Sequence, residues 1–302
     1  HMPMSNNNDE YLLEKKQIIK SFGVAAKEYQ QANILQSTVA ARLLERLDLI
    51  KLQPKRVLDL GCGPGTSSSG LAKYYKKAAV YETDISLQML RQSKSEAPRF
   101  FSRRQRFCSD AEASCVKSAS IDLIFSNLML QWVQNLDTVF NEARRILKPN
   151  SPFIFSTFGP DTLIELRKSW QEVDEQIHVN AFVDMHDVGD ALIRAGMQNP
   201  VMEAEKIMFE YEHAYDLMRD LKKIGAQNVN QGRRKTLTGK SRLKGMLSHY
   251  EKLRVDGRLP ASYEIVYGHA WTPENTHATQ VDARTYAFPV SAITMAKGSK
   301  EV

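Results

Sequence analysis

The amino-acid sequence predicts an α/β protein built on a doubly wound, mostly parallel β-sheet. Between residues 55 and 157, short apolar segments of strand composition alternate with segments of helical spacing, and a glycine-rich turn follows the first strand. This alternation is typical of βαβ units with right-handed crossovers. Helices are expected before this region, and a helical insertion after it.

The chain is long enough to bury a full hydrophobic core. Of its 302 residues, 42% are hydrophobic and 25% are charged, which is usual for a globular protein. No apolar segment approaches the roughly 20 residues that cross a bilayer, and no signal pattern is present, so a cytoplasmic protein is expected. The cysteines show neither metal-site spacing nor an even count, so no metal is expected.

Two helices are expected ahead of the sheet. Residues 11–22 and 34–50 both repeat apolar side chains at helical spacing. Residues 1–10 are polar and are expected to be a tag remnant and a frayed end. Residues 1–54 are therefore expected to form an N-terminal helical cap.

The alternating region predicts four strands, at residues 56–60, 79–84, 121–126 and 152–157. Helices are expected over 66–75, over 136–147, and after Ser86, which has the side chain of an N-cap. A further short strand is expected just before Ser109.

After Pro160 the pattern changes. Helices are expected to residue 176 and over 184–195, followed by a strand at 201–211, a basic helical pair at 215–224 and 241–253, and a strand at 263–269. We expect the core to comprise residues 55–213 and 262–271. The basic insertion, 214–261, would cover the strand ends as a lid, and residues 272–302 would be a tail.

A candidate ligand site lies at the glycine-rich loop Gly61, Cys62, Gly63, Pro64 and Gly65. Glycine lets the backbone approach a ligand without a Cβ clash. The bare motif is equally typical of a plain tight turn. Its Gly-x-Gly-x-Gly spacing differs from the Gly-x-Gly-x-x-Gly that seats a pyrophosphate, which favours a ligand without phosphate groups.

Asp84 strengthens the ligand interpretation. It ends the second predicted strand, 19 residues past Gly65, where a carboxylate can accept hydrogen bonds from ribose hydroxyls. Ile85 and Met89 follow it and could sandwich an adenine ring. An N-cap or surface role for Asp84 is the alternative.

Two further strand ends supply candidates for the same crevice. Asp110 and Ala111 could contact the adenine edge through a carboxylate and a backbone N–H, although a lone Asp here is often a solvated loop residue. Asn127 and Leu128 end the strand at 121–126, and open α/β sheets bind ligands at this edge. Trp132 is equally compatible with the core.

The positive charge of the chain is concentrated in one segment. From Arg219 to Arg258 there are 12 Lys or Arg and 3 Asp or Glu, a local charge of +9. Because the whole chain carries +6, the remainder carries −3. Such a segment indicates an acidic partner, with a solvated helical face as the alternative. A nucleic-acid surface would look similar, but aromatic residues are sparse here.

The motif at 57–65, with Asp84, Asp110, Ala111 and Asn127, resembles the class I methyltransferases. That resemblance covers about residues 55–157. It implies a Rossmann-like sheet of seven strands and S-adenosyl-L-methionine as cofactor.

A second resemblance extends over most of the chain, to the BioC family of malonyl-acyl carrier protein O-methyltransferases of biotin synthesis. It is carried by Tyr29 with Ala25 and Ala26, and by the segments 157–163, 184–190, 221–228, 237–239 and 267–271. It implies methylation of the free carboxylate of a malonyl thioester, on an acidic acyl carrier protein or coenzyme A. No membrane partner is implied.

The resemblance also suggests roles for single residues. Tyr29 matches an aromatic residue that the family places against the cofactor, so it is a candidate for cofactor binding and catalysis; a half-buried core Tyr is the alternative. His186 is a candidate for the malonyl carboxylate, or a structural His. Arg219, Lys222 and Arg234 are candidates for carboxylate or phosphate binding.

Three other functions stay open from the sequence. The chain is also compatible with another small-molecule methyltransferase, with a related arginine hydroxylase that acts in complex assembly, or with a non-catalytic protein that binds S-adenosylmethionine or RNA. The glycine loop cannot separate them.

Overall fold

The computed structural model describes residues 33–98, 102–175, 178–224, 240–274, 279–282 and 285–287. The predicted helix at 11–22, Tyr29, Arg234 and the rest of 225–239 lie outside these residues.

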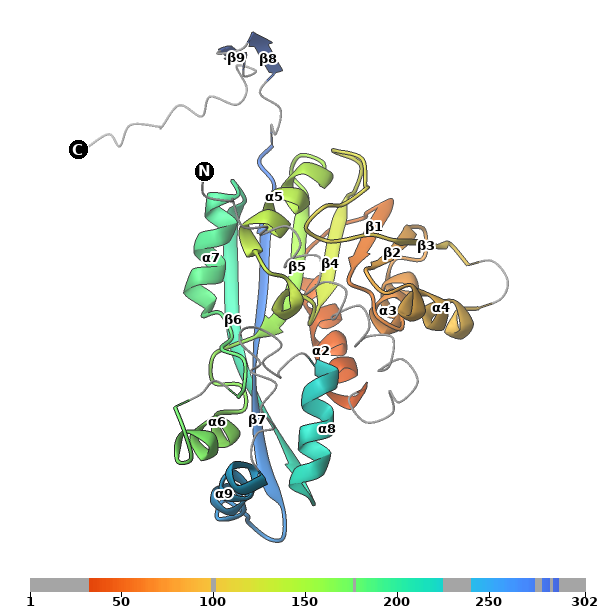
Figure 1. Ribbon diagram of the computed structural model, residues 1–302. Helices are drawn as coiled ribbons and strands as arrows, with labels where there is room; N and C mark the ends of the chain where they lie inside the picture. The colour runs from red at the N-terminus through yellow and green to blue at the C-terminus, as the bar shows by residue number, and fades with distance from the viewer. Residues whose placement is uncertain are drawn as a thin grey trace, which may run out of the picture.

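The centre of the structure is a seven-stranded sheet in the order β3-β2-β1-β4-β5-β7-β6 (Figure 1). The first five strands in this order are parallel, and β7 pairs antiparallel with both β5 and β6. The expected doubly wound, mostly parallel sheet is thus confirmed. The strands are β1 (Arg56–Leu60), β2 (Ala79–Asp84), β3 (Arg104–Cys108), β4 (Leu123–Asn127), β5 (Pro152–Phe158), β6 (Gln198–Tyr211) and β7 (Leu259–Trp271).

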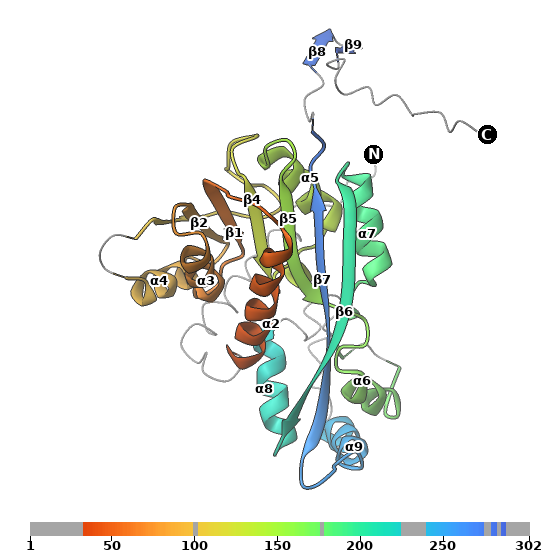
Figure 2. The ribbon, with the colours of Figure 1, turned by 180° about the vertical axis from the view of Figure 1, so that it is seen from behind.

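The central strands are buried because helices cover both faces of the sheet. All seven residues of β5 are buried, which is expected for a strand between two others under helices on both sides. One face packs against α2 (Asn33–Glu45) and α3 (Thr66–Tyr74), and the other against α5 (Leu136–Ile146) and α7 (Met185–Arg194) (Figure 2).

Local sequence signals set several helix starts. The side chains of Ser86, Asn135 and Asp184 each accept a backbone N–H in the first turn of α4 (Leu87–Glu96), α5 and α7. The helix predicted to reach residue 176 is α6 (Ile164–Gln171), and the one predicted over 34–50 ends as a 3-10 helix, η1 (Arg46–Leu49). Among the described residues, no helix is long and apolar enough to span a bilayer.

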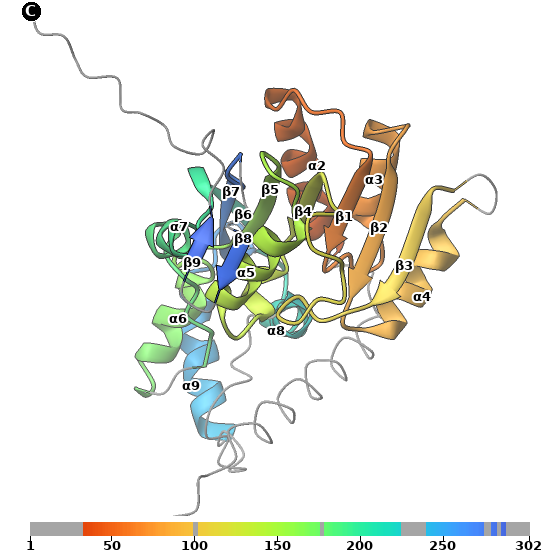
Figure 3. The ribbon, with the colours of Figure 1, turned by 90° about the horizontal axis from the view of Figure 1, so that it is seen from above.

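The hairpin of β6 and β7 is longer than the sequence indicates. Its pairing runs without a break from Val201 opposite His269 to Tyr211 opposite Leu259. Figure 1 shows these two strands extending beyond the neighbouring strands, with α6, α8 (Ala214–Ile224) and α9 (Lys240–Glu251) around the extension. After β7, β8 (Thr279–Asp282) and β9 (Thr285–Ala287) form a separate antiparallel pair (Figure 3).

The basic helical pair does not fold as one unit over the strand ends. Helix α9 packs against α6, and the Tyr250 hydroxyl donates to the Pro260 carbonyl oxygen at 2.8 Å. Helix α8 instead lies near the middle of the sheet, where Gln131 of η2 (Leu130–Trp132) donates to the Ile224 carbonyl oxygen at 3.4 Å. Of the two helices described in the insertion, α8 therefore approaches the strand ends and α9 does not.

A buried ion network joins β2, β3 and the end of the glycine loop. The Glu82 side chain is fully buried and lies 2.6 Å from Arg104 and 2.8 Å from Arg106. Arg104 also donates to the Ser69 hydroxyl at 2.8 Å and to the Gly65 carbonyl oxygen at 3.4 Å. Arg104 thus fixes the first turn of α3 against the sheet.

Replacement of Arg104 by Met is expected to lower the free energy of unfolding by about 3 kcal/mol, because it leaves the buried Glu82 carboxylate with only part of its countercharge. Chemical denaturation would measure this. Arg103→Met is the matched control, since Arg103 is exposed and donates to the Lys77 carbonyl oxygen. Equal losses in the two variants would contradict the role given to the network.

Candidate active site

The glycine loop is anchored to the end of the neighbouring strand β2. The backbone N–H groups of Gly61 and Cys62 both donate to the Thr83 carbonyl oxygen at 2.9 Å. The N–H of Gly63 donates to Asp84 Oδ2, also at 2.9 Å. The loop therefore crosses from the end of β1 to the end of β2 before α3 begins.

Gly65 and Gly63 are glycine for different structural reasons. Gly65 has a φ of +88°, and a Cβ there would lie 2.6 Å from Arg104 Nη2, within the buried ion network. Gly63 has a φ of +52° and open space where a Cβ would stand. At Gly63 bare backbone faces the pocket, as the close approach of a ligand requires.

Asp84 is a buried carboxylate held in one orientation. It is 8% exposed, and while Oδ2 accepts from Gly63, Oδ1 accepts from the Ser86 N–H at 2.8 Å. Burial raises the pKa of Asp84 to about 6, against the lowering effect of these backbone donors. Each oxygen keeps acceptor capacity, so the group can still receive hydroxyl donors from a sugar.

A second carboxyl group lies behind the loop, at Asp59 in β1. It is 1% exposed, and burial raises its pKa to about 7 although the Ser68 hydroxyl donates to Oδ2 at 2.5 Å. Its other oxygen, Oδ1, has no hydrogen-bond partner. The thiol of Cys62, buried beside these carboxyl groups, has a pKa raised well above its usual value by burial.

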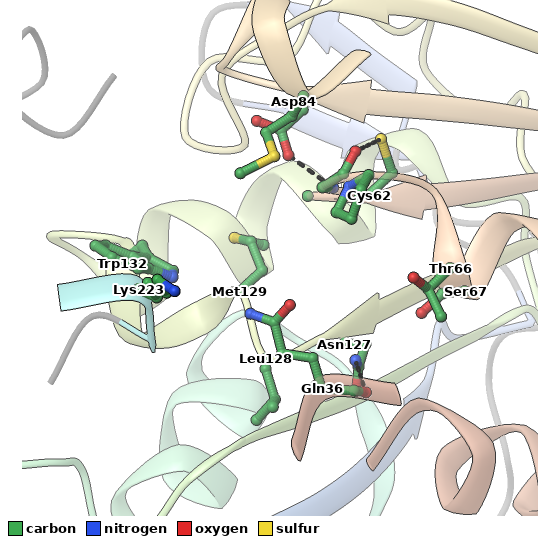
Figure 4. Close-up of a pocket in the computed structure, with 14 residues that line it drawn as sticks. Gln36, Cys62, Thr66, Ser67, Asp84, Asn127, Leu128, Met129, Trp132 and Lys223 are labelled. Atoms are coloured by element: carbon green, nitrogen blue, oxygen red, sulfur yellow. Dashed lines mark hydrogen bonds between the residues drawn. The ribbon is translucent and has the colours of Figure 1, made fainter. Parts of the chain in front are cut away.

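A pocket opens at this edge of the sheet (Figure 4). Seven of the residues predicted for the cofactor line it: Gly61, Cys62, Gly63, Asp84, Met89, Asn127 and Leu128. They come from the ends of β1, β2 and β4 and from α4, as expected for a crevice at the carboxyl ends of the strands.

Helix α2 is bound to the end of β4 on one side of the pocket. Asn127 Nδ2 donates to the Gln36 carbonyl oxygen at 3.1 Å, while Asn127 Oδ1 accepts from the Ser156 hydroxyl at 2.7 Å. Leu128 adopts a φ of +49°, which is rare for a residue with a branched side chain. The chain thus turns sharply into the pocket after β4.

Apart from Tyr29, which lies outside the described residues, four of the predicted cofactor residues are not among the lining residues. Gly65 begins α3 at the back of the loop. Ile85 follows Asp84 and is half-buried, and the Asp84 carbonyl oxygen accepts from the N–H of Ser109 at 3.1 Å. That bond brings Asp110 and Ala111 next to the end of β2.

The predicted substrate residues are separated from one another. His186 is exposed on α7, which packs beside the edge strand β6, across the sheet from β1 and β2. Arg219 is exposed on α8 and pairs with Asp216 at 2.5 Å. The backbone of Lys222 belongs to α8, but its side chain, like Tyr29 and Arg234, lies outside what the structure describes. Neither His186 nor Arg219 lines the pocket.

The pocket also contains residues that the sequence interpretation missed or left as core. The neighbour of Lys222 on α8, Lys223, lines it, and so does Trp132 of η2. The sequence could have indicated that Lys223 points inward. Asp220 lies three residues before it, so the two share a flank of α8 beside its apolar face. The other missed lining residues are Gln36, Thr66, Ser67 and Met129, while Pro64 belongs to the predicted glycine loop.

Comparison with known proteins identifies the family. Residues 58–155 match the family model described as a methyltransferase domain. A malonyl-acyl-carrier protein O-methyltransferase from a Methylovorus species is 45% identical over 271 residues, which cover 88% of this chain and 92% of that protein. The protein of the same name from Legionella pneumophila is 38% identical, with 84% and 90% covered. The chain belongs to the malonyl-acyl-carrier protein O-methyltransferase family.

Solved structures of more distant proteins share the fold. The YcgJ protein of Bacillus subtilis superposes with a TM-score of 0.56 at 13% identity, covering 78% of this chain and 99% of YcgJ. A protein from Bacillus halodurans gives 0.54 at 15% identity, with the same coverage. The methyltransferase family to which this chain belongs is thus built on the fold that the sequence predicted.

The stability of the ligand-free protein is expected to fall as pH rises from about 5 to about 8. Because the pKa of Asp59 is about 7 in the folded state and near 3.8 when unfolded, the folded state holds more protons across this window. Loss of the proton would cost about 2 kcal/mol of the free energy of unfolding.

Denaturation of wild type and Asp59→Asn at both pH values measures the contribution of Asp59. Since Asn does not titrate, the variant should lose less stability on going to high pH. Parallel pH profiles for the two proteins would show that Asp59 is already ionised when folded.

Proposed function

We propose that this protein is an S-adenosyl-L-methionine-dependent carboxyl O-methyltransferase. It would convert the malonyl group carried by acyl carrier protein to its methyl ester, in the early steps of biotin biosynthesis. The observation that carries the proposal is the near full-length match to relatives named malonyl-acyl-carrier protein O-methyltransferase. The geometry of the pocket supports it.

The residues present fit the cofactor. Bare backbone at Gly63 allows close approach, and the oriented Asp84 carboxylate suits the two hydroxyls of a ribose. The carboxyl groups of Asp59, Glu82 and Asp84 lie together beneath the loop, as their mutual electrostatic effects indicate. The Asp84 carboxylate, which lines the pocket, disfavours an anionic phosphate group at this end of it. When bound, the cofactor would supply an electrophilic methyl group.

The protein's own part in the reaction would be alignment and exclusion of water. A malonyl carboxylate is ionised at neutral pH and needs no general base to attack a methyl group. The pocket walls would therefore hold donor and acceptor in line and strip water from the nucleophile. Tyr29, from the residues outside the described part, stays a candidate for orienting the two groups.

The basic segment 219–258 would receive the acidic carrier protein. Several of its described cations are exposed, including Arg219, Arg242 and Lys244. Complementary charge steers such encounters and raises association rates. His186, Arg219, Lys222 and Arg234 stay proposed substrate contacts, of which the exposed Arg219 suits the carrier surface better than the reacting carboxylate. The expected cytoplasmic location also stays a prediction.

Incubation with methyl-labelled S-adenosylmethionine and malonyl-acyl carrier protein, or malonyl-coenzyme A, is expected to give base-labile label on the acyl group.

In the same assay Asp84→Ala should raise the KM for S-adenosylmethionine about tenfold or more, since a hydrogen bond to a charged group contributes about 1.5–3 kcal/mol. Circular dichroism controls for folding. No transfer by folded, cofactor-binding wild type would overturn the proposed function.

Charge reversal of Arg233, Arg234 and Lys235 together should reduce kcat/KM more for malonyl-acyl carrier protein than for malonyl-coenzyme A, because only the carrier protein meets an extended surface. The matched control reverses Lys73, Lys76 and Lys77, three exposed lysines at the end of α3 and the turn after it. Equal losses for the two acceptors, or equal losses in the control, would argue against docking through this segment.

A further inference from the structure

One cation of the basic segment points inward rather than to solvent. Lys223 is 8% exposed and lines the pocket that contains Gly63, Asp84 and Asn127. Among the residues that the structure describes, it is the one Lys or Arg lining that pocket. In Figure 4, Lys223 and Trp132 occupy the opposite side of the view from Thr66 and Ser67. The pocket thus has an ammonium group in one of its walls.

The backbone that carries Lys223 is well anchored. Leu217, Leu221 and Ile224 of α8 are buried in the same core cluster as α2 and β7. Beside these apolar residues, the Tyr211 hydroxyl donates to Asp220 Oδ2 at 3.1 Å. These contacts hold Lys223 at the pocket wall, so that it is a fixed feature of the site.

A second cavity is lined by neighbouring residues of α2 and α8, and its lining is more acidic than that of the first pocket. Ile34, Leu35 and Ile224 form part of its wall, next to the residues Gln36 and Lys223 of the first pocket. Its other lining residues include four acids and a single cation: Glu210, Glu212, Asp216, Asp220 and Arg258. An anionic group would be repelled there. Of the two neighbouring cavities, the one with Lys223 suits a carboxylate.

Asp84 and Lys223 lie in two different walls of the first pocket, and each wall suits a different ligand group. Asp84 lies at the loop end, where its negative charge excludes a second carboxylate but accepts sugar hydroxyls. Lys223 comes from a different part of the chain, the insertion between β6 and β7. Asp220, one turn before it, has its pKa raised by burial, while Lys223 and Arg219 act to lower it.

We propose that Lys223 forms the subsite for the free carboxylate of the methyl acceptor. This deepens the proposed function and rests on it. One carboxylate oxygen pairs with Lys223 Nζ while the other faces the methyl donor. An uncharged acyl thioester cannot make this ion pair, and so Lys223 selects acyl groups that end in a carboxylate.

The subsite affects binding of the acceptor more than the chemical step. In the reaction a bond forms from the carboxylate oxygen to the methyl carbon, the bond from that carbon to sulfur breaks, and its electron pair goes to sulfur. No proton is transferred. The carboxylate loses its charge as it becomes an ester, so the ion pair with Lys223 weakens along the reaction and favours release of the product.

The test is steady-state kinetics of Lys223→Met with malonyl-coenzyme A, which avoids effects of carrier docking. KM for malonyl-coenzyme A should rise about tenfold or more while kcat stays within about threefold, since an interaction no stronger in the transition state acts on KM. The dissociation constant of S-adenosylhomocysteine should not change. Lys244→Met, at an exposed position of α9, is the matched control and should behave as wild type.

Two results would overturn the subsite. One is an unchanged KM for malonyl-coenzyme A. The other is weakened binding of S-adenosylhomocysteine, which would assign Lys223 to the carboxylate of the cofactor. If wild type transfers no methyl group, the proposed function fails, and calorimetric titration of malonyl-coenzyme A into the S-adenosylhomocysteine complex still decides the subsite. Binding by wild type but not by Lys223→Met supports it; equal binding, or none by either protein, rejects it.

Discussion

The structure of the site depends on the bonds that join the glycine loop to the end of β2. The Thr83 carbonyl oxygen accepts from two consecutive N–H groups, and the Asp84 carboxylate accepts from a third, that of Gly63. These bonds are possible because β1 and β2 are adjacent and parallel, so that both strands end at the same edge of the sheet. They leave the loop backbone facing the pocket and fix Asp84 in one orientation. The fold and the ligand site therefore have a common origin in the strand order.

The remaining walls come from segments far apart in the sequence. Helix α2 precedes the sheet and is bound to Asn127 through the Gln36 carbonyl oxygen, whereas α8 lies between the last two strands and brings Lys223. Both helices pack on the same hydrophobic cluster, with Leu35 and Leu43 from α2 and Leu217 and Ile224 from α8. Their packing on this cluster places Gln36 and Lys223 at the pocket.

The sequence was sufficient to predict the parallel sheet, the loop, Asp84 and Asn127, because each depends on a local pattern at a strand end. It was insufficient where tertiary packing decides. The extra length of β6 and β7 results from mutual pairing, which residues such as Pro260 do not suggest. Likewise, the charge count placed Lys223 in a basic surface, although the apolar face of α8 turns it inward. Position on a helix flank was more informative here than the summed charge.

The charges around the pocket are ordered in a way that suits a methyl transfer between unlike ions. Carboxyl groups lie beneath the glycine loop, and an ammonium group lies in the wall formed by α8. In the proposed reaction the donor would lie at the Asp84 carboxylate and the anionic acceptor at Lys223, so that unlike charges would face each group across the pocket. Transfer of the methyl group leaves both ligands without the charge that held them. In the proposed reaction both products would therefore be held less tightly than the two substrates.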